Sequence, residues 1–457
     1  MAGIGFELRK LLRKRTYTGL LRAYAYAGII SSGPWVLSIL GILLIGIFSL
    51  GAIDTDASIT QFQVTVTYLF LISLILTGLV QLSFTRFVAD QLFLHRTEAV
   101  MPNFNGLLLL AMSVSLLLAL PAAALLFPAQ SVLYRLLFAI GLTVMSAIWI
   151  ATVFLTGLKH YRAIVLIYFL GYLCTVGLAL ALRHLSGLEG LLLGFVIGQV
   201  LLLMGMIWLV YRHYNADRFI AFDIWKPGAM YRSLMATGFL FNLGTWIDKI
   251  LFWYHPDTGQ AVIGPLHASV IYDFPIFLAY LSVIPGMAVF LVRIETDFVE
   301  YYVKFYDAVR EGATLDYIER MRNQMVYYVR RGLFDIAKIQ AIAVLVTLVL
   351  GESLLQFLGI STLYLPLLYI DVIGTALQVV LLGILNVLFY LDQRRAVLLL
   401  TALLPLFNLV FTALSLQAGA NWFGYGFAFA MLLTVLIGLW ILSRKLDNLE
   451  YQTFMLQ

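Results

Sequence analysis

Residues 104–126 read FNGLLLLAMSVSLLLALPAAALL, and residues 132–157 read VLYRLLFAIGLTVMSAIWIATVFLTG. Each run is long enough to cross a hydrocarbon layer about 30 Å thick, which takes about 20 apolar residues of helix. Only residues 127–131 separate the two runs, and so short a connection joins antiparallel neighbours. This stretch therefore predicts a helical hairpin within a membrane.

Runs of this kind recur along the whole chain. Of its 457 residues, 62% are hydrophobic and 12% charged, and the mean hydropathy is +0.96. Soluble domains carry about a quarter charged residues, so the apolar excess must face lipid. The run nearest the N-terminus, at residues 23–50, is too long for a signal-peptide core and is expected to be an uncleaved span. We predict an all-α polytopic membrane protein of about 12 transmembrane helices, at residues 23–50, 60–88, 104–126, 132–157, 163–182, 188–211, 233–254, 269–292, 333–357, 363–391, 396–417 and 424–443.

The basic residues predict the orientation, because cytoplasmic segments of membrane proteins collect Lys and Arg. With the N-terminus inside, all but three of the 29 basic residues face the cytoplasm; the exceptions are Arg135, Arg183 and Lys249. We therefore expect both termini in the cytoplasm.

Six spans, a charged linker and six further spans predict two six-helix bundles. Gly33-Pro34-Trp35 in the first span and Gly244-Thr245-Trp246 in the seventh are a short internal echo. If the halves are a repeat, substrate passes between them. A stripe of Gly190, Gly194 and Gly198 predicts close helix packing in the sixth span. The predicted parts are a basic amphipathic segment (1–22), the first bundle (23–211), the linker (212–232), the second bundle (233–443) with a cytoplasmic amphipathic helical insert (293–332), and a cytoplasmic tail (444–457).

Several function classes are disfavoured. The sequence has no G-x-x-x-x-G-K-[ST] motif for a nucleotide-driven motor, and its non-spanning stretches are too short for a catalytic domain. Cys174 is the single cysteine, and the six histidines lack metal-ligand spacing. We expect a conduit and not an enzyme, with no cofactor, no metal site and no nucleic-acid partner.

Ionisable groups in the spans are candidates for function, because each costs several kcal/mol in hydrocarbon unless it is paired or hydrated. Asp248, Lys249, Asp273 and Asp371 fall in the outer half of the second bundle on the predicted orientation, and the polar Asn242 lies in the same span as Asp248. Two interpretations stay open. One is a hydrated, acid-lined substrate path; the other is a structural ion pair of Lys249 with Asp273 or Asp371.

Further path candidates are Arg135, near an outer span end, and the deeper aromatic residues Trp35, Trp149, Trp246 and Tyr272. Apolar ring faces can stack on sugar C–H surfaces, whereas aromatic residues at span ends form the interfacial belt. Four residues are candidate hinges, since proline removes a backbone donor and glycine loosens the turn; they are Gly33, Pro34, Pro275 and Pro285.

A helical stripe follows the eighth span and comprises Phe298, Tyr301, Tyr302, Phe305 and Tyr306. Basic and acidic residues balance in this segment, so anionic lipid gives it little attraction. We expect it to dock against a protein partner or against the base of its own bundle. The basic N-terminal segment is instead expected to rest on membrane lipids.

Three motifs resemble a known family: MAGIGFELRKLL (1–12), AYAYAG (23–28) and SGPWVLS (32–38). They are similar to the Pel exopolysaccharide inner-membrane transporters, within the multidrug/oligosaccharidyl-lipid/polysaccharide flippase superfamily. The resemblance implies two six-helix bundles around a central cavity in a Gram-negative cytoplasmic membrane. It implies transport of a galactosamine-rich polymer for the biofilm matrix, with a cytoplasmic glycosyltransferase and cyclic di-GMP-responsive membrane subunits as partners. It supplies no residue motif for the site.

Three other functions fit the residues. A lipid-linked oligosaccharide flippase needs cationic groups for a diphosphate, and Lys249 stands among surplus aspartates. Buried aspartates also suit an ion-coupled antiporter. A membrane scaffold for a synthase complex, which transports nothing, is the third.

Overall fold

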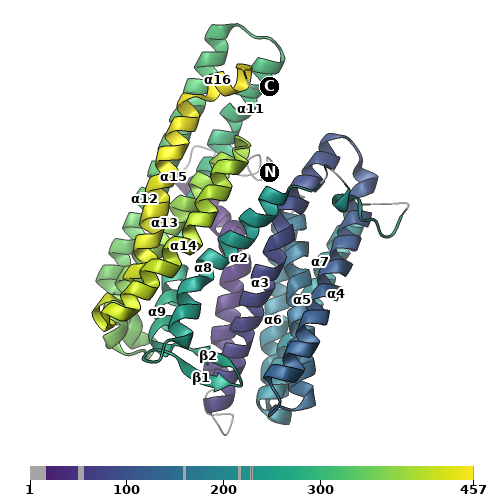
Figure 1. Ribbon diagram of the computed structural model, residues 1–457, viewed down its shortest axis with the longest axis vertical. Coiled ribbons are helices and arrows are strands. Elements are labelled where there is room, and N and C mark those ends of the chain that lie inside the picture. The colour runs from purple at the N-terminus through teal and green to yellow at the C-terminus, as the bar shows by residue number, and fades with distance from the viewer. Residues whose placement is uncertain are drawn as a thin grey trace. The chain divides into compact units, whose positions relative to one another are not determined.

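The computed structural model describes residues 17–49, 56–157, 161–214, 218–226, 228 and 230–455, which are mostly helical (Figure 1). A short antiparallel hairpin is formed by β1 (Gln260–Ile263) and β2 (Leu266–Ala268). A π-helical turn, η3 (Arg293–Phe298), joins α10 to α11. The principal helices are α2 (Tyr17–Ser49), α3 (Asp56–Phe93), α4 (Val100–Leu126), α5 (Val132–Gly157), α6 (Tyr161–Ser186), α7 (Leu188–His213), α8 (Arg232–Tyr254), α9 (Val270–Leu281), α10 (Ile284–Val292), α11 (Val299–Arg310), α12 (Leu315–Phe357), α13 (Leu365–Tyr390), α14 (Arg394–Ala418), α15 (Tyr425–Asp447) and α16 (Leu449–Met455).

The predicted class, an all-α polytopic membrane protein, is confirmed. Among the described residues, 10 helical runs are long and apolar enough to cross a membrane. The helix α2 is bent between Tyr24–Ser32 and Val36–Gly46, and if these two pieces make one span the number rises to 11. The runs coincide with the predicted spans. The predicted seventh span is also a helix, α8, but with Asn242, Asp248 and Lys249 it is not among these runs. The count of twelve and the orientation stay predictions.

The predicted insert 293–332 is helical but is not a separate element. The eighth span continues through η3 into α11, and α12 is a single helix of 43 residues that includes the ninth span. Gly312, at φ +65°, lies in the turn between α11 and α12 and is free to adopt this left-handed conformation. The insert is thus a helical hairpin that extends two spans.

The chain forms two compact units. Unit 1 holds the described residues of Met1–Ser32 and Ile271–Gln457, and unit 2 those of Gly33–Val270. Figure 1 shows α12 to α15 side by side in unit 1, and α3 to α7 side by side in unit 2. These limits differ from the predicted boundary at 212–232, because α8 packs on α3 and thereby joins unit 2.

Close approach of the backbone holds α6 and α7 together in unit 2. A Cβ atom added to Gly194 would lie 2.4 Å from the Cα of Ala179, and one added to Gly198 would lie 2.4 Å from the Cα of Thr175. One added to Gly190 would lie 2.2 Å from the carbonyl oxygen of Leu182. The predicted packing role of the glycine stripe is confirmed.

In unit 1, the predicted eighth span is broken between α9 and α10. Ser282 and Val283 lie at the break, and Pro285 occupies the first turn of α10, where its missing N–H costs nothing. The break is packed by α12, since Gln340 donates to the carbonyl oxygen of Val283 (3.4 Å). Pro275 lies inside α9.

We expect Gly194→Ala to lower the free energy of unfolding by about 1–3 kcal/mol, because the new methyl group must push α6 away from α7. Gly177→Ala, in the same hairpin, is the matched control: a Cβ there meets no atom within 4 Å. It should leave stability unchanged or raise it by up to about 1 kcal/mol. Thermal unfolding of the purified variants in one detergent measures both. Equal stabilities would contradict the packing.

Candidate functional site

The first group of candidate residues lies on α8 in unit 2. The ammonium of Lys249 is 3.0 Å from a carboxylate oxygen of Asp248 and donates to the carbonyl oxygen of Thr245 at 3.0 Å. The side chains of Asp248 and Lys249 are 0% and 2% exposed. The same ammonium lies 5.6 Å from the ring centroid of Trp246, within cation–π range. Two opposite charges thus share one buried site.

A glycine crossing positions this pair. A Cβ added to Gly238 of α8 would lie 2.3 Å from the carbonyl oxygen of Gly78 on α3, so the two backbones touch here. One turn further along α8, Asn242 donates to the carbonyl oxygen of Leu74 at 2.7 Å. The α3–α8 contact therefore fixes the position of Asp248 and Lys249 along α3.

The aromatic candidates of unit 2 join the same core. Trp246 packs near Trp253 (centroids 6.2 Å apart), and Trp253 stacks on Tyr68 of α3 at 4.8 Å. The indole N–H of Trp149 donates to the hydroxyl of Ser73 on α3 at 2.9 Å. The structure therefore brings Asn242, Trp149 and Trp246 together around one helix, α3.

Arg135 lies elsewhere. Its guanidinium donates to the carbonyl oxygens of Pro128 (2.6 Å) and Gln130 (2.8 Å) and so closes the turn between α4 and α5. Arg135 holds this hairpin turn, and its place in a substrate path stays a prediction.

The second group of candidates belongs to unit 1. Tyr272 and Asp371 are 0% exposed, and Asp273 is half-buried. Gly424 approaches Asp371 at φ +82°, where an added Cβ would lie 3.0 Å from a carboxylate oxygen. Because the two groups lie in different units, a joint substrate path stays a prediction.

Some candidates lie outside the described side chains. The backbone at Gly33, Pro34 and Trp35 is helical, and their side chains are not among those described. The chain passes from unit 1 to unit 2 between Ser32 and Gly33. Residues 1–16 of the amphipathic segment lie outside the described residues.

The aromatic stripe of α11 is turned inward, onto its own bundle, which is one of the two alternatives that the sequence left open. Phe298 and Phe305 are 0% exposed. Tyr390 of α13 packs against Phe298 (5.5 Å between centroids) and Tyr302 (5.4 Å). Tyr301 stacks on Tyr328 (4.6 Å), and Tyr306 packs on Tyr302 (4.7 Å). The stripe docks against its own bundle because those rings fill the space between α11, α12 and α13.

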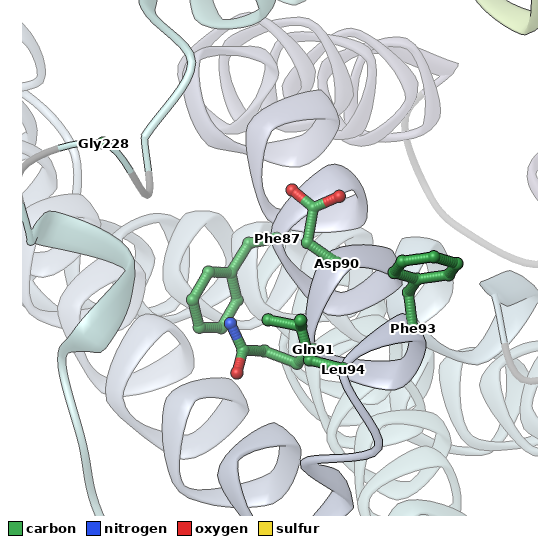
Figure 2. Close-up of a pocket in the computed structure, with 6 residues that line it drawn as sticks. All are labelled: Phe87, Asp90, Gln91, Phe93, Leu94 and Gly228. Atoms are coloured by element: carbon green, nitrogen blue, oxygen red, sulfur yellow. The ribbon is translucent and has the colours of Figure 1, made fainter.

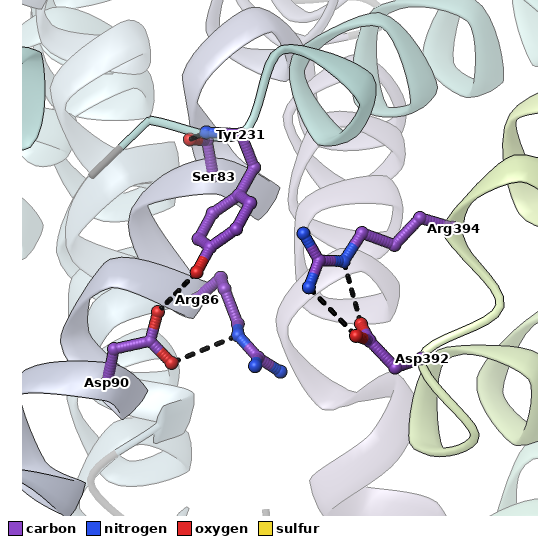
Figure 3. A network of polar contacts seen from close by, with 6 residues as sticks. All are labelled: Ser83, Arg86, Asp90, Tyr231, Asp392 and Arg394. Atoms are coloured by element: carbon purple, nitrogen blue, oxygen red, sulfur yellow. Dashed lines mark hydrogen bonds and ion pairs between the residues drawn. The ribbon is translucent and has the colours of Figure 1, made fainter. Parts of the chain in front are cut away.

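A polar network at the end of α3 was not predicted. Asp90 accepts from the hydroxyl of Tyr231 (3.0 Å) and pairs with Arg86 (3.0 Å), as Figure 3 shows. Figure 3 also shows the pair of Arg394 with Asp392 (2.7 Å), which belongs to unit 1. Asp90 also lines a pocket of about 440 Å³ (Figure 2). The other lining residues are Phe87, Gln91, Phe93, Leu94 and Gly228.

The linker is pinned to α4 by a buried amide. Asn103 accepts from the backbone N–H of Asp223 (2.7 Å) and donates to its carboxylate (3.1 Å). Hydrogen bonds from Lys226 and Asn103 hold the pKa of Asp223 below its usual range. Asn105 donates to the carbonyl oxygen of Phe219 at 2.8 Å. Polar residues at the start of the apolar run 104–126 were the available signal for this contact.

Comparisons identify relatives of the whole chain. The sequence matches the PelG family, described as an exopolysaccharide exporter (EPS-E), over residues 1–454. No curated protein matches it. Among the described residues, no group of three or more His, Cys, Asp or Glu is placed to hold a metal ion.

Solved transporters share the fold. An outward-facing multidrug resistance MATE family transporter of the MOP superfamily has a TM-score of 0.66 and 12% identity, covering 94% of this chain and 96% of its own. An inward-facing one has a TM-score of 0.62 and 12% identity, covering 92% and 99%. A MOP superfamily transporter from Pyrococcus furiosus, described by the reverse polarity of its binding pocket, has a TM-score of 0.62 and 12% identity. The match covers 93% of this chain and 96% of that transporter. At such identities the likeness shows the fold alone.

Neutralising one member of the α8 pair should destabilise the protein far more than neutralising both. Removing one partner leaves an uncompensated buried charge, which costs about 3–5 kcal/mol. We expect losses of this size for Lys249→Met and Asp248→Asn, and a clearly smaller loss for the double variant. Thermal unfolding of the four proteins gives the coupling energy. Additive losses would show that Asp248 and Lys249 do not depend on one another.

Proposed function

The chain belongs to the PelG family of exopolysaccharide exporters, and from this premise we propose that its cargo is the Pel polymer, a galactosamine-rich and partly deacetylated polysaccharide. The match over residues 1–454 is the observation that carries the proposal. The chain is a multi-pass inner-membrane protein with the fold of MOP-superfamily transporters. A transporter of this kind needs a separate enzyme to make its cargo.

The proposed partner is a cytoplasmic glycosyltransferase that feeds the growing polymer into the transporter. Membrane subunits that respond to cyclic di-GMP complete the proposed complex, whose product enters the biofilm matrix. The surface of this chain on which we propose that the glycosyltransferase docks does not include Phe298 or Phe305, because both side chains are buried.

We place the polymer path along the acidic and aromatic groups of the two units. Carboxylates of Asp273 and Asp371 can accept hydrogen bonds from sugar hydroxyls, and such charge-assisted bonds are about twice as strong as neutral ones. Trp246, which is half-buried, offers a ring face for sugar C–H surfaces. Tyr272 and Asp371 are buried in this structure and would contact sugar only after the helices around them move. Polymer conduction needs many weak contacts of this kind, so that each sugar unit both binds and leaves.

A lipid-linked oligosaccharide flippase is less well supported. Its diphosphate requires available cations. Lys249, the lysine of the predicted seventh span, already binds Asp248 and Thr245.

Sealed vesicles that contain this chain and its synthase, with the synthase active site facing the medium, test the proposal. We expect polymer made from added sugar nucleotide to accumulate inside and to resist an added glycosidase. Polymer that stays fully accessible to the glycosidase, while synthesis is normal, would contradict transport and favour a scaffold. Enclosure of a lipid-linked oligosaccharide alone would favour the flippase.

The same vesicles test the path. Asp273→Asn and Asp371→Asn should each lower the rate of enclosure by roughly tenfold, the effect of losing about 1.4 kcal/mol of binding. Asp257→Asn, at an exposed carboxylate between α8 and β1, is the matched control and should keep the full rate. Full rates in both path variants would remove these aspartates from the path.

A further inference from the structure

The π-helical turn η3 carries a buried carboxylate, Glu295, which is not part of the proposed polymer path. Glu295 is 5% exposed and is placed between α10 and α11 in unit 1. Turns of this type are rare and are frequently found at functional sites. The turn presents Glu295 to the last two turns of α13.

The hydrogen-bond partners of Glu295 on α13 are neutral. The hydroxyl of Tyr390 donates to one carboxylate oxygen at 2.8 Å, and the amide of Asn386 donates to the other at 3.4 Å. The amide oxygen of Asn386 is buried and has no hydrogen-bond partner among the described residues. Because amide N and O are assigned from the network, a flip of Asn386 turns this oxygen toward Glu295. A proton on Glu295 then has an acceptor.

The cation on η3 is already neutralised. The guanidinium of Arg293 binds Asp297 (2.8 Å) and Asp335 of α12 (2.8 Å). Arg293 thus has two carboxylate partners of its own. The elements packed on η3 are α10, α11, α12 and α13, and α10 carries no titratable side chain. Among the described residues, the other titratable groups near Glu295 or its neighbour Arg293 are Tyr302, Tyr390 and, on α2, Tyr24. The ammonium of the chain's N-terminus also acts on Glu295 electrostatically and favours its ionised form.

These contacts favour the neutral acid. Burying an ionised carboxylate among neutral hydrogen-bond partners costs free energy, whereas a carboxylic acid both accepts and donates a hydrogen bond. We propose that Glu295 is a proton-binding site of this transporter, protonated in the packed arrangement described here and ionised when η3 separates from the end of α13. The ligand is a proton, and the site does not depend on which polymer is carried.

Proton release would be linked to a change in packing. Tyr390 binds Glu295 through its hydroxyl and packs its ring against Phe298 and Tyr302. Ionised Glu295 gains most free energy from water, which it reaches only if these rings part. A proton therefore holds α11 on α13, and its loss frees the inner end of unit 1, on the cytoplasmic side of the predicted orientation.

Infrared spectroscopy of the protein in lipid nanodiscs detects the proton directly. At neutral pH the wild-type minus Glu295→Gln spectrum should contain the carbonyl stretch of a protonated carboxylic acid. The wild-type minus Glu311→Gln spectrum, for an exposed glutamate, should lack it. Tyr390→Phe should shift the band in frequency, since it removes a hydrogen bond and leaves Glu295 in place. A wild type without the band at neutral pH would overturn the proposal.

Amide hydrogen exchange tests the linked opening. As the pH rises and the band disappears, exchange in residues 293–306 and 386–392 should increase in the wild type, beyond the intrinsic effect of pH. Glu295→Gln, which mimics the protonated acid, should keep these segments protected. The same increase in both proteins would contradict the linkage, and a band that persists in alkali would contradict proton release.

Discussion

The ion pair of Asp248 with Lys249 is the interaction on which the architecture of the second half depends. A single charge at this depth costs several kcal/mol, and two charges in contact cost much less. If α8 spans the membrane as predicted, the contact between these two charges lowers the cost of burying them there. If α8 crosses, the β1–β2 hairpin is outside and each later span has its predicted direction. If it does not, every span after it is inverted, and the basic residues of α12 lie on the wrong side.

The same rule governs the other polar groups, which find partners within their own unit. Asn242 binds the backbone of α3, Trp149 binds Ser73, and Gln340 binds the backbone at the α9–α10 break. Without water in the bilayer core, each of these donors requires a protein acceptor. The polar side chains thus fix which helices are neighbours, and the glycines fix how closely they approach.

Local patterns predicted much of this fold. Span positions follow from hydropathy, and the stripe of Gly190, Gly194 and Gly198 fits only a close helix contact. The pairing of Asp248 with its sequence neighbour was not predictable, because adjacent residues on a helix point in different directions and only side-chain rotamers bring them together. The burial of Phe298 and the unit limits depend on how α11 and α8 rotate against α13 and α3, which one-dimensional periodicity leaves open. The sequence did not distinguish Glu295 from the other acidic residues of segment 293–332, because its burial depends on the π-helical turn η3.

The two units do not coincide with the two halves of the sequence. Unit 1 includes the described start of α2, and unit 2 includes α8, so each half contributes part of its first helix region to the other unit. The chain thus passes between the units within α2 and again at the α8–α9 connection. The candidate hinge at Gly33 and Pro34 lies beside one of these two crossing points.

Cysteine labelling on the two sides of α8 tests this account most directly. In a Cys174→Ala background, Lys226→Cys and Asp257→Cys place one thiol in the linker and one beyond the end of α8, both at exposed positions. We predict that a membrane-impermeant maleimide added outside spheroplasts labels position 257 at once and position 226 only after lysis. Labelling of both positions from the same side would show that α8 does not cross, and labelling of 226 alone from outside would reverse the orientation.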